Sequence, residues 1–159
     1  MDKQIITAAI ISALEAKLSI ALAATQRAID AATDEETVPE HKYDTLALEA
    51  SYLAHGQAMR VQECEQELTV FRNLKVRSFE VQAIAVGAYV ELEDEQEILK
   101  RFFISPCAGG LAISYQSNPV YLLTTQSPLG RVLKGKLEGD EVQLSIADKS
   151  MTYQVVTVR

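Results

Sequence analysis

Six carboxylates are concentrated in residues 30–44, where Lys42 is the only base, and we call this stretch the acidic segment. Carboxylate oxygens are good ligands for Mg²⁺, which usually takes only one or two from a protein and keeps several waters. The segment could therefore add ligands to a metal ion held by another protein. Its acids are equally compatible with a helix N-terminus, where the dipole favours negative charge, or with a solvated loop. The six are Asp30, Asp34, Glu35, Glu36, Glu40 and Asp44.

The sequence contains few other candidates for a catalytic site. His41 and His55 are the only histidines, and together with Cys64 they have no established metal-ligand spacing. No serine or cysteine lies in a nucleophile motif. The basic residues 134–136 lack the upstream glycines and the Ser/Thr of a phosphate-binding loop. Two cysteines are too few for a disulfide framework, so we expect reduced thiols. We therefore expect a protein that is not a stand-alone enzyme and has no cofactor of its own.

The acidic segment joins two regions whose small and apolar residues recur in alternating steps of four and three, the spacing of a coiled coil. The first, residues 3–33, contains no Gly or Pro, and the second follows a bend at Pro39 and extends to about residue 73. Two such helices joined by a short turn form an antiparallel hairpin. At about 1.5 Å per residue, some 30 residues reach roughly 45 Å. The seam comprises Leu14, Leu18, Ala21, Thr25, Ala28 and Ala32, then Tyr43, Ala47, Ala50, Ala54, Gln57, Val61, Cys64, Leu68 and Phe71.

After Asn73 the hydrophobic period changes to two and β-branched and aromatic residues become common, which predicts strands. Ser127 before Pro128 is typical of a helix N-cap with Pro at the first helical position. We expect an α+β chain with an antiparallel coiled-coil hairpin in residues 1–75 and a twisted antiparallel sheet with one short helix in residues 76–159. The strand candidates are residues 81–86, 88–93, 98–104, 111–114, 120–124, 141–146 and 152–158.

The net charge of −7 lies almost entirely in the first half of the chain, because residues 1–74 contain six bases and twelve acids. This excess argues against direct DNA or RNA binding, which depends on Lys and Arg neutralising phosphates. Glu15 and Lys17 interrupt the first apolar run, so this run falls short of the roughly 20 residues of a membrane span. We expect a cytoplasmic protein with no membrane association.

The order of parts and three motifs resemble the Gre transcript-cleavage factors of bacterial RNA polymerase. A long hairpin with an acidic tip precedes a sheet domain, and Tyr43 follows the acidic stretch as a tyrosine follows the tip motif of the family. The resemblance covers essentially the whole chain. The motifs are Ser127-Pro128-Leu129-Gly130-Arg131, Leu133-Lys134-Gly135-Lys136 and Gly139-Asp140-Glu141-Val142.

This resemblance implies an FKBP-like sheet domain that docks on the rim of the polymerase secondary channel and is not an isomerase. It implies that the hairpin enters the channel, where two tip acids help to bind the second Mg²⁺ of the polymerase and position water for hydrolysis of backtracked RNA. The candidate catalytic acids are Glu36 and Glu40, and the candidate Mg²⁺ ligands are Asp34, Glu35, Glu36 and Glu40. The candidate docking residues are Ser127, Pro128, Leu129, Gly130, Arg131, Lys134 and Lys136, whose bases suit an acidic protein surface.

The tip departs from the family pattern. Aligning on Tyr43 places the family's aspartate at Glu36 but its glutamate at Pro39, one residue before Glu40, and its glycine at Glu35. Two functions therefore stay open, a cleavage factor and a channel-binding regulator or inhibitor without cleavage activity. A coiled-coil interaction or chaperone-like protein is a further alternative, which predicts apolar residues exposed toward the tip. A prolyl isomerase would rest on fold alone, and fold does not carry function.

Overall fold

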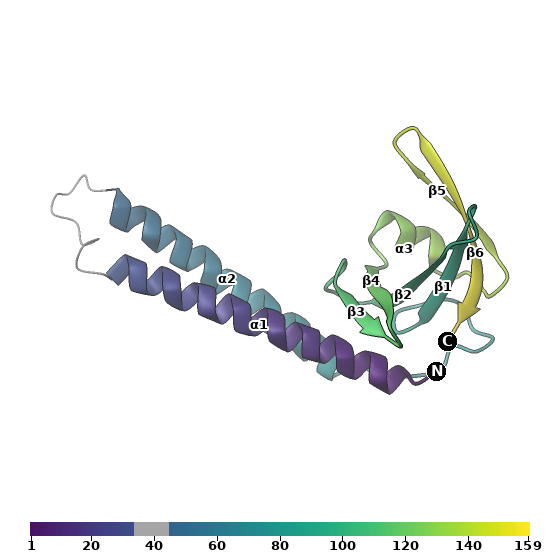
Figure 1. The fold of residues 1–159 in the computed structure, drawn as a ribbon, viewed down its shortest axis with the longest axis horizontal. Helices are drawn as coiled ribbons and strands as arrows, with labels where there is room; N and C mark the ends of the chain where they lie inside the picture. The colour runs from purple at the N-terminus through teal and green to yellow at the C-terminus, as the bar shows by residue number, and fades with distance from the viewer. Residues whose placement is uncertain (34–44) are drawn as a thin grey trace. The chain divides into compact units, whose positions relative to one another are not determined.

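The computed structural model describes residues 1–33 and 45–159. The chain divides into two compact units, residues 11–72 and residues 1–10 with 73–159. Residues 1–10 thus group with the sheet, whereas the sequence assigned them to the hairpin. The elements in chain order (Figure 1) are α1 (Lys3–Thr33), α2 (Leu46–Arg72), β1 (Tyr89–Asp94), β2 (Leu99–Ser105), β3 (Ala112–Tyr115), β4 (Asn118–Thr124), α3 (Pro128–Leu133), β5 (Glu141–Ile146) and β6 (Lys149–Val158).

Within residues 11–72, α1 and α2 form an antiparallel hairpin (Figure 1). Lys17 Nζ lies 2.8 Å from Glu67 Oε2, and Arg72 Nη2 lies 2.8 Å from Glu15 Oε1, so residues early in α1 pair with residues late in α2. Each such partly exposed pair contributes up to about 1 kcal/mol. The heptad residues between positions 14 and 32 and between positions 50 and 71 are all buried or half-buried, as the sequence predicts. The buried ones are Leu14, Ala21, Ala28, Cys64, Leu68 and Phe71.

By length and composition alone, α1 is long and apolar enough to cross a membrane, and 28% of its most apolar window is buried. This is weak evidence, because signal sequences and core helices of soluble proteins pass the same test. Glu15 and Lys17 of α1 are engaged with charges of α2, an arrangement suited to a hairpin packed in water.

The second unit contains a six-stranded sheet in the order β3-β4-β2-β1-β6-β5. Neighbouring strands are antiparallel except β2 and β4, which are parallel from Phe102↔Tyr121 to Ser105↔Thr124. The sheet is therefore mixed, where the sequence predicted a wholly antiparallel one. The difference arises because β3 does not pair with β2; it pairs with β4 at the edge of the sheet, and β4 then runs in the direction of β2.

The strand predicted at residues 81–86 is absent from the described sheet, and a turn stands at its start. Gln82 N donates to Phe79 O at 2.9 Å, which closes a four-residue turn. Val81 occupies the third position of this turn with φ +60° and a fully exposed side chain. Phe79 and Ile84 are buried on either side, so the apolar residues of the segment fill the core without forming a strand.

One face of the sheet packs on α3 to make the main core, which includes Val90, Leu92, Ile104, Val155 and Leu133. The helix begins as the sequence predicts, because the Ser127 side chain accepts a hydrogen bond from Gly130 N and Pro128 follows at the first helical position.

Candidate functional site

The predicted metal-directed residues Asp34, Glu35, Glu36 and Glu40 lie outside the described residues, as do Pro39 and Tyr43. The described elements on either side are the end of α1 and the start of α2. Thr33 closes α1, donating from Oγ1 to Ile29 O at 2.9 Å, and Glu49 N donates to Thr45 O at 2.9 Å in the first turn of α2. Residues 34–44 thus connect two helices of one hairpin. Their roles as catalytic acids and Mg²⁺ ligands stay predictions.

Among residues 1–33 and 45–159, no group of three or more His, Cys, Asp and Glu side chains could hold a metal ion. Of the acids named in the acidic segment, only Asp30 is described, and its Oδ1 accepts a hydrogen bond from Gln26 Nε2 at 2.8 Å along α1. Cys64 is a buried free thiol in the hairpin seam, as a core residue would be.

The segment Ser127–Lys136 forms α3 and the turn that follows it, and its residues fall into two groups. Ser127, Leu129 and Gly130 face inward: Ser127 Oγ also donates to Thr124 O at 2.7 Å, and Leu129 packs against the core. Arg131, in α3, and Lys134, the residue that follows the helix, are both exposed.

Two further residues complete this segment. Pro128 is exposed at the first turn, and Lys136 is half-buried with its carbonyl oxygen accepting from Ile84 N at 2.8 Å. The structure therefore places two exposed bases, Arg131 and Lys134, in and directly after a helix whose inner side is fixed to the sheet. Their role in docking stays a prediction.

Gly130 is required where it stands, because α3 approaches the end of β4 closely. A Cβ added there would lie 1.9 Å from the Thr124 carbonyl oxygen. The glycine of the Ser127–Arg131 motif thus has a packing cause in this chain, apart from any resemblance.

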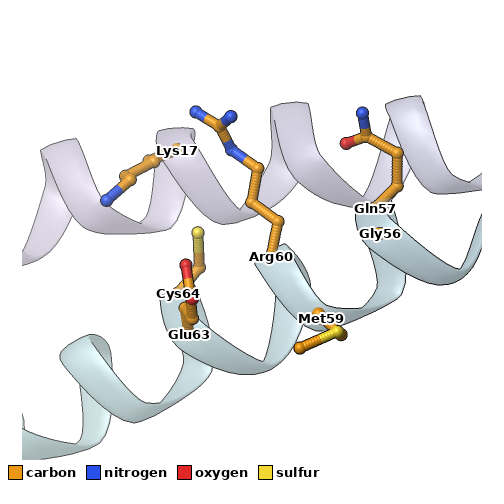
Figure 2. A pocket seen from close by; sticks show the side chains of 7 residues that line it. All are labelled: Lys17, Gly56, Gln57, Met59, Arg60, Glu63 and Cys64. Atoms are coloured by element: carbon orange, nitrogen blue, oxygen red, sulfur yellow. The ribbon is translucent and has the colours of Figure 1, made fainter. Parts of the chain in front are cut away.

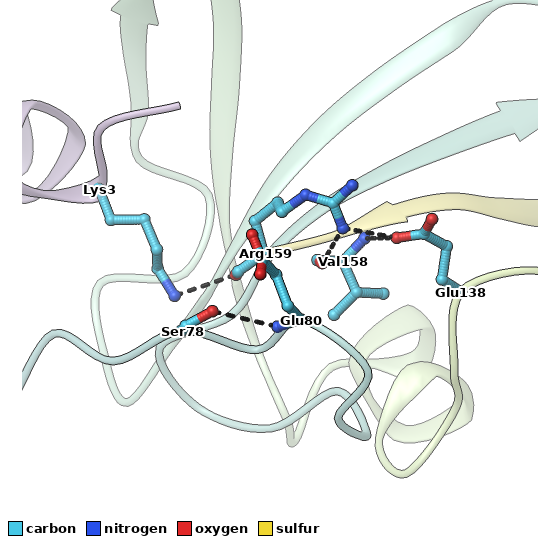
Figure 3. A network of polar contacts seen from close by, with 6 residues as sticks. All are labelled: Lys3, Ser78, Glu80, Glu138, Val158 and Arg159. Carbon is cyan, nitrogen blue, oxygen red and sulfur yellow. Dashed lines mark hydrogen bonds and ion pairs between the residues drawn. The ribbon is translucent and has the colours of Figure 1, made fainter.

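Lys3 is a functional candidate that the sequence analysis missed. Its Nζ donates to Arg159 O at 3.0 Å (Figure 3). The same Nζ donates to Arg77 O at 2.7 Å and lies 4.5 Å from the ring centroid of Phe79. The Arg77 guanidinium lies 4.5 Å from the same ring. Burial, and secondarily the charge of Arg77, lower the pKa of Lys3 to about 8. No periodicity or motif distinguishes a lysine at this position, so the sequence contained no signal for it.

The carboxylate of Glu138 binds the end of β6, on the other side of Val158 and Arg159 from Lys3 (Figure 3). Its Oε2 accepts from Val158 N at 3.1 Å and from Arg159 Nη1 at 2.7 Å. The backbone hydrogen bond, followed by that from Arg159, holds the pKa of Glu138 below its usual range. Lys3 and Glu138 thus bind Val158 and Arg159, at the end of β6, and anchor this end of the strand in the sheet unit.

Neither a protein-family model nor a curated protein sequence matches the chain. Solved structures do resemble it. GreA factor homolog 1 (Gfh1) of Thermus thermophilus is 22% identical with a TM-score of 0.38, covering 94% of both chains. A structure of the transcription factor Gfh1 is 19% identical with a TM-score of 0.42, covering 95% of this chain and 94% of that one. Thermus aquaticus Gfh1 is 21% identical with a TM-score of 0.39, covering 92% and 91%. The first is named a homologue of the GreA factor, the family that the motifs indicate, but at these values the likeness assigns no activity and no residue role to this chain.

Proposed function

We propose that this chain is a Gre-like factor that binds bacterial RNA polymerase in the cytoplasm, inserts its helical hairpin into the secondary channel and modulates transcription elongation. The observation that carries the proposal is the hairpin: two paired helices connected by residues 34–44, which contain five acids and one base. This arrangement suits a protein that delivers carboxylates to a site belonging to a partner.

The hairpin has the length and stiffness that such delivery requires. The part of α1 within the hairpin unit, residues 11–33, extends about 35 Å at about 1.5 Å per residue. A buried heptad seam and two ion pairs between the helices, Lys17 with Glu67 and Glu15 with Arg72, oppose their separation. An arm of this kind can enter a narrow channel without unfolding.

The acids named by the resemblance fit a hard divalent cation, because they supply only oxygen ligands. In this proposal Glu36 and Glu40 act in trans beside the Mg²⁺ of the polymerase, and Asp34 and Glu35 are further ligands. Bound Mg²⁺ supplies Lewis-acid activation of water for phosphodiester hydrolysis. The contribution of this chain is to place carboxylates and hold them.

Docking is assigned to the segment Ser127–Lys136 of the sheet unit, which we take to be FKBP-like without isomerase activity. Arg131 of α3 and Lys134 directly after it are exposed, and the capped first turn and buried Leu133 of α3 fix the helix to the sheet. Exposed bases on a rigid backbone suit an acidic surface on the polymerase. Because the backbone that bears them is already ordered, binding loses little backbone conformational entropy.

The deciding experiment measures RNA cleavage in stalled transcription complexes, together with binding of the chain to polymerase. We expect stimulation by the wild type, loss with Glu36→Ala, and no loss with Glu65→Ala, which removes an exposed acid from α2 outside the connection. Binding that persists in all three would place the effect in the chemistry. Binding without stimulation would replace the cleavage function with that of a channel regulator or inhibitor, and absence of binding would refute the proposal.

A specific observation favours a second candidate, a coiled-coil interaction or chaperone-like protein. The start of α2, next to the acidic segment, exposes three large apolar side chains: Leu48, Tyr52 and Leu53. Exposed apolar residues toward the tip are what that class predicts. Suppression of aggregation of a denatured client protein, lost on changing Tyr52 and Leu53 to serine, would support it.

A further inference from the structure

One flank of the hairpin contains a groove that the described side chains leave open, which we call the flank groove. Two adjoining hollows of about 420 and 550 Å³ form it, and both are lined by Lys17, Gln57 and Arg60. Figure 2 shows the side chain of Lys17 on α1 and that of Arg60 on α2, the latter directed toward α1. The other lining residues are Ala13, Ala16, Ile20, Ala21 and Ala24 of α1 and Gly56, Met59, Glu63 and Cys64 of α2.

The α1 side of the flank groove has the spacing of a second coiled-coil seam. Ala13, Ala16, Ile20 and Ala24 follow one another in steps of three, four and four, which places them on one side of the helix. Ile20 is 69% exposed, more than any other large apolar residue of α1. Small residues around one large residue let another helix approach closely and give it a side chain to pack on. This spacing indicates a helix as the occupant.

Gly56 gives an independent indication. It lies in the interior of α2, where glycine is less favourable than alanine. A Cβ at this position would meet no atom of the described residues within 4 Å, so their packing does not require glycine. A glycine without an internal cause leaves the helix backbone open to the close approach of another backbone.

The flank groove contains one basic side chain that no described carboxylate neutralises. Lys17 pairs with Glu67, while Arg60 has no ion pair or hydrogen bond with any residue in 1–33 or 45–159. An unpaired guanidinium favours a partner that supplies a carboxylate.

The lining also separates a protein helix from RNA. Single-stranded RNA is bound by combining cations with aromatic side chains on which bases stack. The flank groove has no aromatic residue among its described lining residues.

We propose that the flank groove binds an amphipathic α-helix of a partner protein. The helix packs apolar side chains on Ile20 and the alanines, approaches the backbone at Gly56 and pairs a carboxylate with Arg60. This inference does not depend on polymerase binding, because it concerns the side of the hairpin and a different group of residues from the acidic segment.

The test uses the full chain and two fluorescein-labelled helical peptides of about 21 residues, or three heptads, with leucine and alanine at the seam positions. One peptide has glutamate at the flanking positions and the other has glutamine. Fluorescence anisotropy should show that the glutamate peptide binds the wild type about tenfold more tightly. Arg60→Gln should reduce this preference to less than about twofold.

The matched variants are Gly56→Leu, which fills the groove, and Ala58→Leu, which adds the same side chain at an exposed position of α2 outside it. We expect Gly56→Leu to weaken binding of the glutamate peptide about tenfold and Ala58→Leu to change it less than about twofold. Leucine is a good helix former at both positions, so circular dichroism should show folded hairpins and weaker binding will not reflect unfolding.

Three results would overturn the inference. The first is equal binding of the two peptides, or no binding of either. The second is equal affinity of Gly56→Leu and Ala58→Leu. The third is a different occupant: a wild-type dimer in sedimentation that Gly56→Leu dissociates would identify a second copy, and oligouridylate binding that Arg60→Gln removes would identify RNA.

Discussion

Replacing Gly130 with alanine tests whether the Ser127–Lys136 segment depends on the close approach of α3 to β4. The new Cβ would lie 1.9 Å from Thr124 O and 2.9 Å from Ser127 Oγ. The nearest atom belongs to the backbone, so no side-chain rotation relieves the clash. The helix or the strand end has to move by more than about 1 Å to reach a van der Waals separation of roughly 3.5 Å.

The cost follows from what this movement breaks. Ser127 Oγ accepts from Gly130 N at 3.1 Å, and loss of such an N-cap costs about 1 kcal/mol. Displacement of α3 also disturbs Leu133, which is fully buried in the main core, and forced repacking of a core costs about 1–3 kcal/mol. We expect Gly130→Ala to lower the free energy of unfolding by about 2–4 kcal/mol.

Urea unfolding followed by circular dichroism measures this change, and Gly56→Ala is the comparison. The same substitution at Gly56 meets open space in a helix, so it should raise the free energy of unfolding by about 0.5–1 kcal/mol. A loss of less than about 1 kcal/mol at Gly130 would refute the reasoning, because the strand and helix would then be free to separate. In the proposed function, Gly130→Ala should also weaken polymerase binding, whereas Gly56→Ala should not.

Three other predictions concern the sheet unit. Val81 has φ +60° and a fully exposed side chain, and asparagine tolerates this left-handed conformation better than a β-branched residue does. In urea unfolding, Val81→Asn should raise the free energy of unfolding by about 1 kcal/mol, while Val81→Thr should leave it unchanged. The pKa of Lys3 is lowered to about 8 in the folded chain, so above that pH the unfolded chain binds more protons than the folded chain. The free energy of unfolding should therefore rise between about pH 8 and the ordinary lysine pKa, and Lys3→Met should remove this rise. The pKa of Glu138 is lowered, so the stabilisation from its carboxylate should be present at neutral pH and lost on acidification. Glu138→Gln should therefore be less stable than the wild type near pH 7, and the two stabilities should converge in acid.

The sequence predicted the hairpin well, because helix periodicity is a local property and the apolar side that it marks is the side that becomes buried. Leu14, Ala21, Cys64 and Leu68 lie in the seam where the heptads placed them. The start of α3 was equally readable, since Ser127 and Pro128 act through their immediate neighbours.

Strand direction and the conformation of residues 81–86 were not readable from the sequence. A period of two gives the two faces of a strand but not its neighbour, so the parallel pairing of β2 with β4 left no mark in the sequence. Val81 illustrates a different limit. A β-branched residue is typical of a strand, yet here it occupies a left-handed turn between the buried anchors Phe79 and Ile84, where the tertiary structure overrides its preference.

The candidate site divides in the same way. The acidic segment is visible in the sequence because charge density needs no structure to be counted, and its chemistry follows from its carboxylates. The role of Lys3 depends on carbonyl groups 74 and 156 residues away, which only the fold brings to its Nζ. The flank groove is also invisible beforehand, since Ile20 and Arg60 lie far apart in the chain.

The two glycines Gly56 and Gly130 separate internal from external requirements. At Gly130 the chain itself supplies the atom that excludes a side chain, so glycine there is explained by folding alone. At Gly56 the described residues supply no such atom. Glycine there lowers the stability of the helix relative to alanine, and no contact among the described residues explains its presence. A substitution that stabilises the isolated chain at Gly56 while weakening a complex would therefore locate the requirement in a partner. The opposite signs of the two alanine substitutions make stability measurements informative about binding before any partner has been isolated.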